Sequence, residues 1–183
     1  MRIVGGKHRG RPLALVGKIT TRETADMVKE SVFNMLGGRI DGIALDLFAG
    51  SGAYGLEAIS RGATHLFAVD NDRDAVKTII SNAKSLKEDA QVTVIQKDVL
   101  RYLNGLEQSK RFDVVFIDPP YDIVIYLDVL NLLVPYLNED AYIVCESKRQ
   151  VILDEQVQTL EKIKERVYGI KRITIYQNKR TEE

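Results

Sequence analysis

The order of elements along this 183-residue chain predicts an α/β protein with a doubly wound, mostly parallel sheet. Short apolar runs typical of buried strands alternate with longer amphipathic segments typical of helices. A glycine-rich turn follows the first of these strands, and an Asp-Pro-Pro-Tyr sequence follows the fourth. Ligands bind at the carboxyl ends of strands in such sheets, so we expect both motifs at one edge.

The first part of the chain is expected to form a small extension in front of the sheet. Residues 1–16 predict a short hairpin whose flexible points are glycines, and Thr21 or Thr24 could cap a helix that ends near Leu36. We therefore divide the chain into a basic hairpin and helix, residues 1–40, and a single globular unit, residues 41–183.

The globular unit is expected to alternate strands with helices. Apolar runs predict strands at 43–48, 64–69, 92–96, 112–117 and 141–146, and the intervening segments predict helices ending near 61, 86, 106 and 133. Residues 160–169 and 172–177 alternate apolar and polar side chains, which predicts an antiparallel pair at the end of the chain.

Composition indicates one compact domain. The chain is 45% hydrophobic, with no repeat or low-complexity tract, and one core can accommodate this length. No apolar stretch reaches membrane-spanning length, the start lacks the apolar core of a signal peptide, and no metal ligands cluster. The single cysteine, Cys145, fits a reducing compartment and a packing role. We expect a soluble, cytoplasmic monomer without a metal.

Charge is distributed unevenly although the net charge is zero. Through residue 40, eight basic residues face three acidic ones, a net charge of +5. Such a segment fits a flexible arm that lies along RNA phosphates, and the alternative is a solvated basic tail. Within it we expect His8 to stack or to contact phosphate. The predicted RNA contacts are Arg2, Lys7, Arg9, Arg11 and Arg22.

The glycine-rich turn predicts a nucleotide-like cofactor. Gly50, Gly52 and Gly55 match G-x-G-x-x-G after a strand, and Asp70 ends the next strand, placed to bind ribose hydroxyls. This pattern alone also fits a nicotinamide dinucleotide. Asp46, four residues before Gly50, suits a cationic ligand better than a pyrophosphate, which favours S-adenosylmethionine.

The Asp-Pro-Pro-Tyr sequence, residues 118–121, predicts a site that binds a planar amino group. The carboxylate of Asp118 can accept an N–H, and prolines lack an N–H, which leaves carbonyl groups free. Tyr121 offers a ring on which a base can stack. Taken alone, the tetrapeptide also fits an ordinary turn.

These motifs resemble those of a known family. Asp46-x-Phe48-Ala49-Gly50-Ser51-Gly52 with Asp118-Pro119-Pro120-Tyr121 is similar to class I amino-group methyltransferases. Met1-Arg2-Ile3-Val4-Gly5-Gly6, Arg9-Gly10-Arg11 and the segment 21–34 narrow the resemblance to the RsmD family of 16S ribosomal RNA guanine-N2 methyltransferases. The family often has Arg-Pro-Thr where this chain has Arg22-Glu23-Thr24.

The resemblance implies a Rossmann-like, seven-stranded sheet with an antiparallel last strand, and S-adenosylmethionine as cofactor. It implies catalytic roles for Asp118, Pro119, Pro120 and Tyr121. The implied cofactor-binding residues are Asp46, Phe48, Ala49, Gly50, Ser51, Gly52, Gly55, Asp70, Asn71, Asp98, Val99 and Asp118. Asp98 is also a candidate helix cap, and Glu57 receives no role from the sequence.

The expected activity is methylation of a guanine N2 amine in 16S ribosomal RNA, free or in an assembling small subunit. The residues by themselves also fit adenine N6 in RNA or DNA, because the motif recognises only an exocyclic amine. A nicotinamide dehydrogenase and a non-catalytic RNA-binding module for ribosome assembly are the further alternatives. The choice of guanine and of 16S RNA comes from the resemblance alone.

Overall fold

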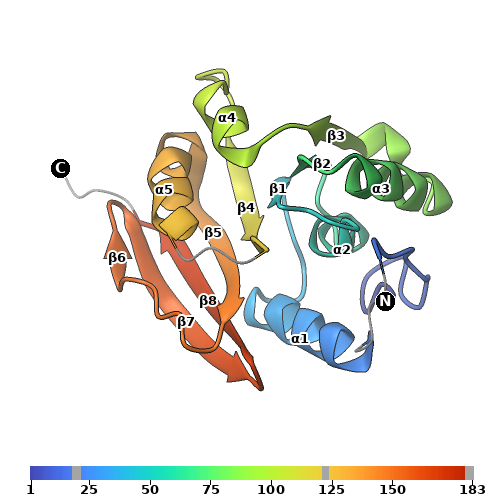
Figure 1. The fold of residues 1–183 in the computed structure, drawn as a ribbon, viewed down its shortest axis with the longest axis horizontal. Helices are drawn as coiled ribbons and strands as arrows, with labels where there is room; N and C mark the ends of the chain where they lie inside the picture. Colours follow the sequence, from blue (N-terminus) through green and yellow to red (C-terminus); the bar gives the residue numbers. More distant parts are fainter. Residues whose placement is uncertain (18–21, 121–123, 180–183) are drawn as a thin grey trace.

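The computed structural model describes residues 1–17, 22–120 and 124–179, and its centre is a single mixed sheet (Figure 1). The strand order is β3-β2-β1-β4-β5-β8-β7-β6. The strands are β1 Ile43–Leu47, β2 His65–Asp70, β3 Val92–Gln96, β4 Phe112–Ile117, β5 Leu137–Lys148, β6 Gln156–Val157, β7 Leu160–Tyr168 and β8 Lys171–Asn178. The helices are α1 Arg22–Met35, α2 Ala53–Ser60, α3 Arg73–Ser85, α4 Val99–Asn104 and α5 Val124–Leu133, with short 3-10 turns at Asp89–Gln91 and Val134–Tyr136.

The strand directions confirm the predicted fold class. Strands β1 to β5 are mutually parallel, β8 pairs antiparallel with β5, and β7 pairs antiparallel with β8. The count of seven strands was wrong, because the described residues form eight. The additional strand, β6, has only two residues, which is too short to produce a periodic pattern in the sequence.

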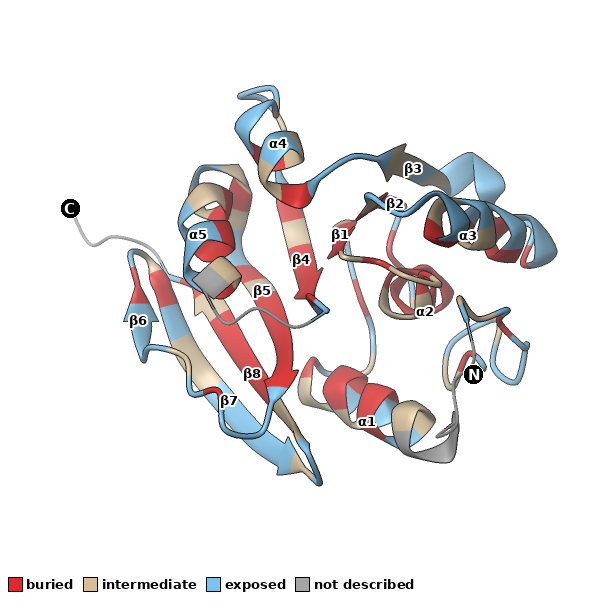
Figure 2. Cartoon of the chain, in the orientation of Figure 1, coloured by how far each residue is buried: buried red, intermediate tan, exposed pale blue. Residues whose placement is uncertain are grey.

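The sheet is covered on both faces, and β4 shows why its sequence is apolar throughout. Val114 and Phe116 pack in the cluster that includes residues of α1, α2 and α3, whereas Val115 and Ile117 pack in the cluster with α4 and α5. A strand enclosed on both sides needs apolar residues at successive positions. Figure 2 shows β4 and β5 buried over most of their length, while β7 is largely exposed.

Strand β5 is longer at both ends than the predicted 141–146. Leu137 already pairs with Phe112, and the register then shifts near Asp140, whose backbone has φ 62. At the other end the strand continues to Lys148, which pairs with Lys171 of β8. This extension brings the last residues of β5 beside the first residues of β8.

The N-terminal segment forms a hairpin with one bridge, between Arg2 and Pro12. It is not a flexible arm, so that expectation was wrong: Ile3 is fully buried and Leu13 nearly so, in the same cluster as Phe33 of α1. Of the two predicted caps, Thr24 lies inside α1 and Thr21 lies outside the described residues.

Candidate active site

Two adjoining cavities open at the carboxyl ends of the central strands. The first, about 280 Å³, lies over the segment between β1 and α2 and is also bordered by α1 and the N-terminal hairpin. The second, about 470 Å³, lies between the ends of β4 and β5 and the β7–β8 turn. Three residues border both cavities, namely Asp118, Glu146 and Lys171, so the two spaces meet at these side chains.

The glycine-rich segment forms the floor of the first cavity, bordered by Phe48, Ala49, Gly50 and Ser51. Phe48 and Gly50 both have φ 58, in the left-handed region that turns the chain sharply away from β1. No atom lies within 4 Å of the position that a Cβ on Gly50 would take, so the backbone there is open to a ligand.

The two other glycines of the motif serve packing. Gly52 has φ 79 and is the N-cap residue of α2, where no side chain caps the helix. A Cβ on Gly55 would come within 2.6 Å of Leu66, so only glycine lets α2 lie this close to β2. The predicted positions Gly52 and Gly55 therefore do not border the cavity but hold its floor in place.

Asp46, near the carboxyl end of β1, borders the first cavity. Only 3% of its surface is exposed, and its Oδ2 accepts the Gly55 N–H at 2.9 Å. Burial raises the pKa of Asp46 from 3.8 to about 8, with a smaller contribution from Asp70. The carboxyl thus links strand and helix while presenting an acidic group to the cavity.

Asp70, Asn71, Asp98 and Val99 lie at the ends of the neighbouring strands, as the sequence placed them, but do not border the first cavity. Asp70 accepts the N–H groups of Gly50 and Asp72, both at 2.9 Å. Asp98 caps α4 by accepting the Arg101 N–H at 3.0 Å. Asp70 is therefore joined directly to the glycine-rich segment, whereas Asp98 has the capping role.

Asp118, Pro119 and Pro120 follow β4 and border the second cavity. The Asp118 residue is exposed at the two cavities, and the protein around it desolvates its carboxyl. This desolvation raises the pKa of Asp118 well above its ordinary value; the charge of Glu146 adds to the rise, and Lys171 opposes it. Tyr121, the fourth residue of the motif, lies outside the described residues.

Glu146, Lys171 and Tyr54 belong to the site, although the sequence did not single them out. Glu146, with 6% of its surface exposed, accepts the Tyr54 O–H at 2.7 Å and the Lys171 Nζ at 2.5 Å. A buried carboxylate at the end of a strand predicted at 141–146 was the available signal. Its partners depend on the pairing of β5 with β8, which no local pattern reveals.

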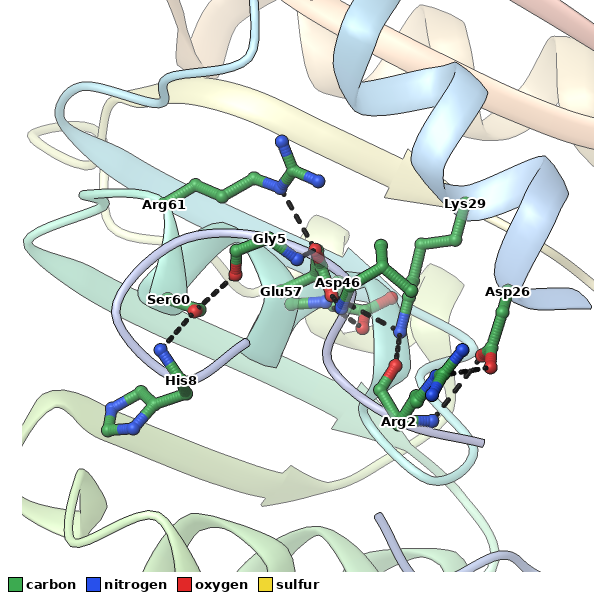
Figure 3. Close-up of polar contacts among 11 residues, drawn as sticks. Arg2, Gly5, His8, Asp26, Lys29, Asp46, Glu57, Ser60 and Arg61 are labelled. Carbon is green, nitrogen blue, oxygen red and sulfur yellow. Dashed lines mark hydrogen bonds and ion pairs between the residues drawn. The ribbon is translucent and has the colours of Figure 1, made fainter. Parts of the chain in front are cut away.

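Glu57 has a clear position: it holds the N-terminal hairpin against α2. It is fully buried, and its two oxygens accept the N–H groups of Val4 at 3.0 Å and Gly5 at 2.9 Å. Arg61 and Lys29 form ion pairs with the same carboxylate at 2.9 and 3.3 Å (Figure 3). We call Glu57, Lys29 and Arg61 the hairpin anchor.

Lys29 connects the hairpin anchor to the first cavity, which it borders. Its Nζ also donates to the Arg2 carbonyl oxygen at 2.7 Å, and burial lowers the pKa of this side chain although Glu57 opposes the change. On the other side of the hairpin, the Ser60 hydroxyl donates to the Gly5 carbonyl at 2.7 Å (Figure 3).

Three of the five basic residues predicted to contact RNA have protein partners. Arg2 forms an ion pair with Asp26 at 3.5 Å, Lys7 pairs with Glu88, and Arg11 donates to the Ser85 carbonyl at 2.7 Å. Arg9 is exposed on the hairpin, and the side chain of Arg22 lies outside the described part of the chain.

His8 contacts protein groups in the structure, and its predicted contact with RNA stays a prediction. Its Nε2 lies 2.6 Å from Oε1 of Glu88, and its backbone N–H donates to the Ser60 hydroxyl at 3.0 Å (Figure 3). His8 therefore ties the hairpin to α2 and to the end of α3. The described residues contain no cluster of three metal-ligating side chains and no helix long and apolar enough to cross a membrane.

Comparison with known proteins agrees with this geometry. A family model described as "Conserved hypothetical protein 95" matches residues 1–177. YlbH of Bacillus subtilis is 40% identical, covering 98% of this chain and 100% of the relative. Ribosomal RNA small subunit methyltransferase D of Haemophilus influenzae is 34% identical, with 97% and 94% covered. The solved structure of yhhF from Escherichia coli has a TM-score of 0.85 at 31% identity, with 98% of both chains covered.

These likenesses and the inserted antiparallel strand define the chain as a methyltransferase with the class I, S-adenosylmethionine-dependent fold. Within that class the match extends over nearly the whole chain, including the N-terminal hairpin. The chain belongs to the RsmD family.

S-adenosylmethionine is the cofactor of this class, and the residues of the first cavity fit it. The molecule carries a sulfonium and an ammonium group, and the cavity is bordered by the carboxyls of Asp46 and Asp118. The open backbone at Gly50 allows close approach of a ligand. Burial raises the pKa of both carboxyls, and a positive charge beside them would favour their ionised form, so these walls suit a cation better than a dinucleotide pyrophosphate.

Proposed function

We propose that this protein transfers a methyl group from S-adenosylmethionine to the exocyclic N2 amine of a guanine in 16S ribosomal RNA of the small subunit. The observation that carries the proposal is the position of Asp118-Pro119-Pro120: all three border the second cavity, and Asp118 also borders the first. The name of the Haemophilus influenzae relative, which aligns over 97% of this chain, supports the RNA class. Such RNA is made and assembled in the cytoplasm, the compartment that we propose.

The protein groups at this junction can position an amine. Guanine N2 is a weak nucleophile because its lone pair is delocalised into the ring. The Asp118 carboxylate and the Pro119 carbonyl would each accept an N–H of that amine, which fixes its direction. Positioning of this kind can contribute up to roughly 7–11 kcal/mol in well-oriented systems.

The bound cofactor supplies an electrophilic methyl group, and the chain supplies a place for the proton that the amine must lose. A carboxylate whose pKa is raised by its surroundings accepts a proton more readily than one in water. Asp118 has such a raised pKa, chiefly because it is desolvated. It is the proposed proton acceptor as well as the group that holds the amine.

The cofactor would be held by Asp46, the open glycine-rich segment and Asp70. Each oxygen of Asp70 already accepts one backbone N–H and retains a second lone pair for a ribose hydroxyl. Asp98 and Val99 at the start of α4 are proposed to contact the adenine, although they do not border the first cavity.

The RNA must present an unstacked base, which costs less in a loop than in a duplex. Arg9 on the hairpin is exposed, and Lys148 and Arg149 lie exposed at the end of β5 beside the second cavity. We propose that phosphates contact the hairpin through Arg2, Lys7, Arg9 and Arg11. Binding by Arg2, Lys7 or Arg11 would compete with their present protein partners.

Methyl transfer from labelled S-adenosylmethionine tests the proposal, with unmethylated small subunits, naked 16S RNA and duplex DNA offered in parallel. The product nucleoside is identified by mass spectrometry, and N2-methylguanosine from subunit or RNA is the expected result. N6-methyladenosine as the product would mean that the methylated base is adenine and that the methyl-transfer chemistry is as proposed. Bound cofactor without transfer to any of the three would favour the non-catalytic binding module.

A further inference from the structure

Three charged side chains adjoin where the two cavities meet. Lys171 Nζ lies 2.5 Å from Glu146 Oε1, and Asp118 borders both cavities with them. Ile117 at the end of β4 pairs with Cys145 of β5, so Asp118 and Glu146 are the next residues on two neighbouring strands, and β8, which begins at Lys171, lies on the other side of β5. Glu146 therefore lies between the other two, in the order Lys171, Glu146, Asp118.

The central member of this row is held in place. The Tyr54 O–H donates to Glu146 Oε2 at 2.7 Å, and the Tyr54 ring stacks on Phe116 with centroids 5.2 Å apart and an interplanar angle of 10°. The Tyr126 O–H donates to the backbone oxygen of Glu146 at 2.5 Å. Each carboxylate oxygen of Glu146 still has a lone pair for a further hydrogen bond.

The row presents a donor, an acceptor and an acceptor in succession. The Watson–Crick edge of guanine presents the complementary series: the O6 acceptor, the N1–H donor and the N2 amine donor. Resting on the methyl transfer proposed above, we propose that Lys171, Glu146 and Asp118 together select guanine. Lys171 donates to O6, Glu146 accepts from N1–H, and Asp118 accepts from the N2 amine.

The same row disfavours adenine, the alternative base for an Asp-Pro-Pro-Tyr motif. When the adenine N6 amine lies at Asp118, the neighbouring ring atom N1 is an acceptor and would face the Glu146 carboxylate. Two acceptors facing each other lose a hydrogen bond and repel, which discriminates against the wrong base. Glu146 is therefore a specificity-determining residue, distinct from the group that holds the amine.

2-Aminopurine separates this role from catalysis, because it keeps the 2-amine but has an acceptor at N1 and no O6. The substrate is a short RNA spanning the nucleotide that the wild-type protein methylates, with guanine or 2-aminopurine at that position. For the wild-type protein we expect kcat/KM to be about 10- to 100-fold higher for guanine, as for a lost base contact.

Glu146→Gln replaces the fixed acceptor with an amide that can also donate to N1 of 2-aminopurine. We expect kcat/KM for guanine RNA to fall at least tenfold and that for 2-aminopurine RNA to stay the same or rise. Lys171→Met should also reduce the ratio of kcat/KM for guanine RNA to that for 2-aminopurine RNA. The variant loses the hydrogen bond to O6, which only guanine has. A purely structural role of Glu146 predicts instead that both substrates slow by the same factor, and that result would overturn the inference.

Glu161→Gln is the matched control, because it makes the same chemical change at an exposed position of β7 away from both cavities. It should leave the preference unchanged. Thermal unfolding checks that Glu146→Gln is folded. If it is not, the preference between the two substrates is measured in Lys171→Met instead. A wild-type protein that methylates no guanine RNA contradicts the proposed function, whereas active wild type with unchanged preference in both variants contradicts only the selection of guanine.

Discussion

At the scale of single residues, Asp46 gives the protein a pH-dependent stability. Burial raises its pKa from 3.8 to about 8, so the folded state holds a proton that the unfolded chain releases. Stability contributed by this group is therefore present at low pH and declines as pH rises from about 4 to about 8.

Asp46→Asn should remove that decline, because Asn cannot ionise but keeps an oxygen for the Gly55 N–H. We expect the free energy of unfolding of the variant, relative to that of the wild type, to be higher at pH 8.5 than at pH 5 by on the order of a few kcal/mol. Urea unfolding at the two pH values measures the difference. Parallel pH dependence of the free energy of unfolding in both proteins would contradict this assignment.

Asp118 is expected to control transfer without controlling cofactor binding. Asp118→Ala should lower kcat by about 100- to 10,000-fold, the usual contribution of a positioned proton acceptor. The dissociation constant for S-adenosylhomocysteine, measured by calorimetry, should change little. Near-normal turnover in this variant would exclude the proposed role.

The raised pKa of Asp118 also predicts a pH profile. Only the ionised carboxyl can accept the proton, so kcat/KM should fall as pH falls through a pKa above the ordinary carboxyl range. Asp118→Asn keeps an acceptor oxygen but cannot ionise, so its residual activity should lack this acidic limb.

The sequence predicted the residues of the site that lie within local motifs, and it missed those assembled by tertiary pairing. Asp46 lies in β1, Gly50 follows β1 and Asp118 follows β4, so a periodic pattern and a turn were enough to find them. Glu146 and Lys171 meet only because β5 extends to Lys148 and pairs there with β8. No spacing in the sequence encodes that register, since it depends on strands joined through β6 and β7.

At the scale of elements, the glycine-rich segment can be tested against a matched turn. Gly50 has φ 58 and Gly169, in the β7–β8 turn, has φ 56, and a Cβ at either position would meet no atom within 4 Å. Alanine should therefore cause similar backbone strain at both, about 1 kcal/mol.

Only Gly50→Ala places a methyl group at the first cavity, so only that variant should weaken cofactor binding, by about tenfold or more. Calorimetry with S-adenosylmethionine measures the affinity, and chemical unfolding measures the strain. Equal cofactor affinity in Gly50→Ala and Gly169→Ala would show that the segment does not approach the ligand.

The hairpin shows a different limit of sequence reasoning. Its strands and glycines were recognisable, but its basic side chains suggested an arm exposed to solvent. The structure attaches it through uncharged backbone N–H groups to Glu57, a helix residue 52 and 53 positions away. No role for Glu57 could be predicted from the sequence, because its hydrogen-bond partners in the hairpin are main-chain N–H groups of a distant segment.

At the scale of the whole molecule, charge separation is the feature to test. The net charge is zero, but the first 40 residues carry eight basic and three acidic groups. Arg9→Glu with Arg11→Glu should weaken binding to 16S RNA and reduce the slope of log affinity against log salt by roughly one to two. S-adenosylhomocysteine affinity should not change.

Arg111→Glu with Arg166→Glu makes the same change in charge at exposed positions outside the first 40 residues and serves as the control. A filter-binding titration at several salt concentrations gives both affinity and slope. Equal loss in the two double variants would mean that overall charge, rather than the hairpin, attracts the RNA.

The overall topology was predictable from the alternation of strands and helices, because parallel strands joined by helices permit few arrangements. The extent of β5 and the presence of β6 were not. The first depends on a register shift beside Asp140 and the second on only two residues, Gln156 and Val157.

The hairpin anchor has a consequence for how the chain reaches its final form. During synthesis residues 1–13 leave the ribosome before Glu57, Ser60 and Glu88, the residues that hold them, have been made. These residues therefore stay undocked until α2 and the segment after α3 have been made. Since Lys29 and the hairpin border the first cavity, that cavity is complete only after the hairpin has docked.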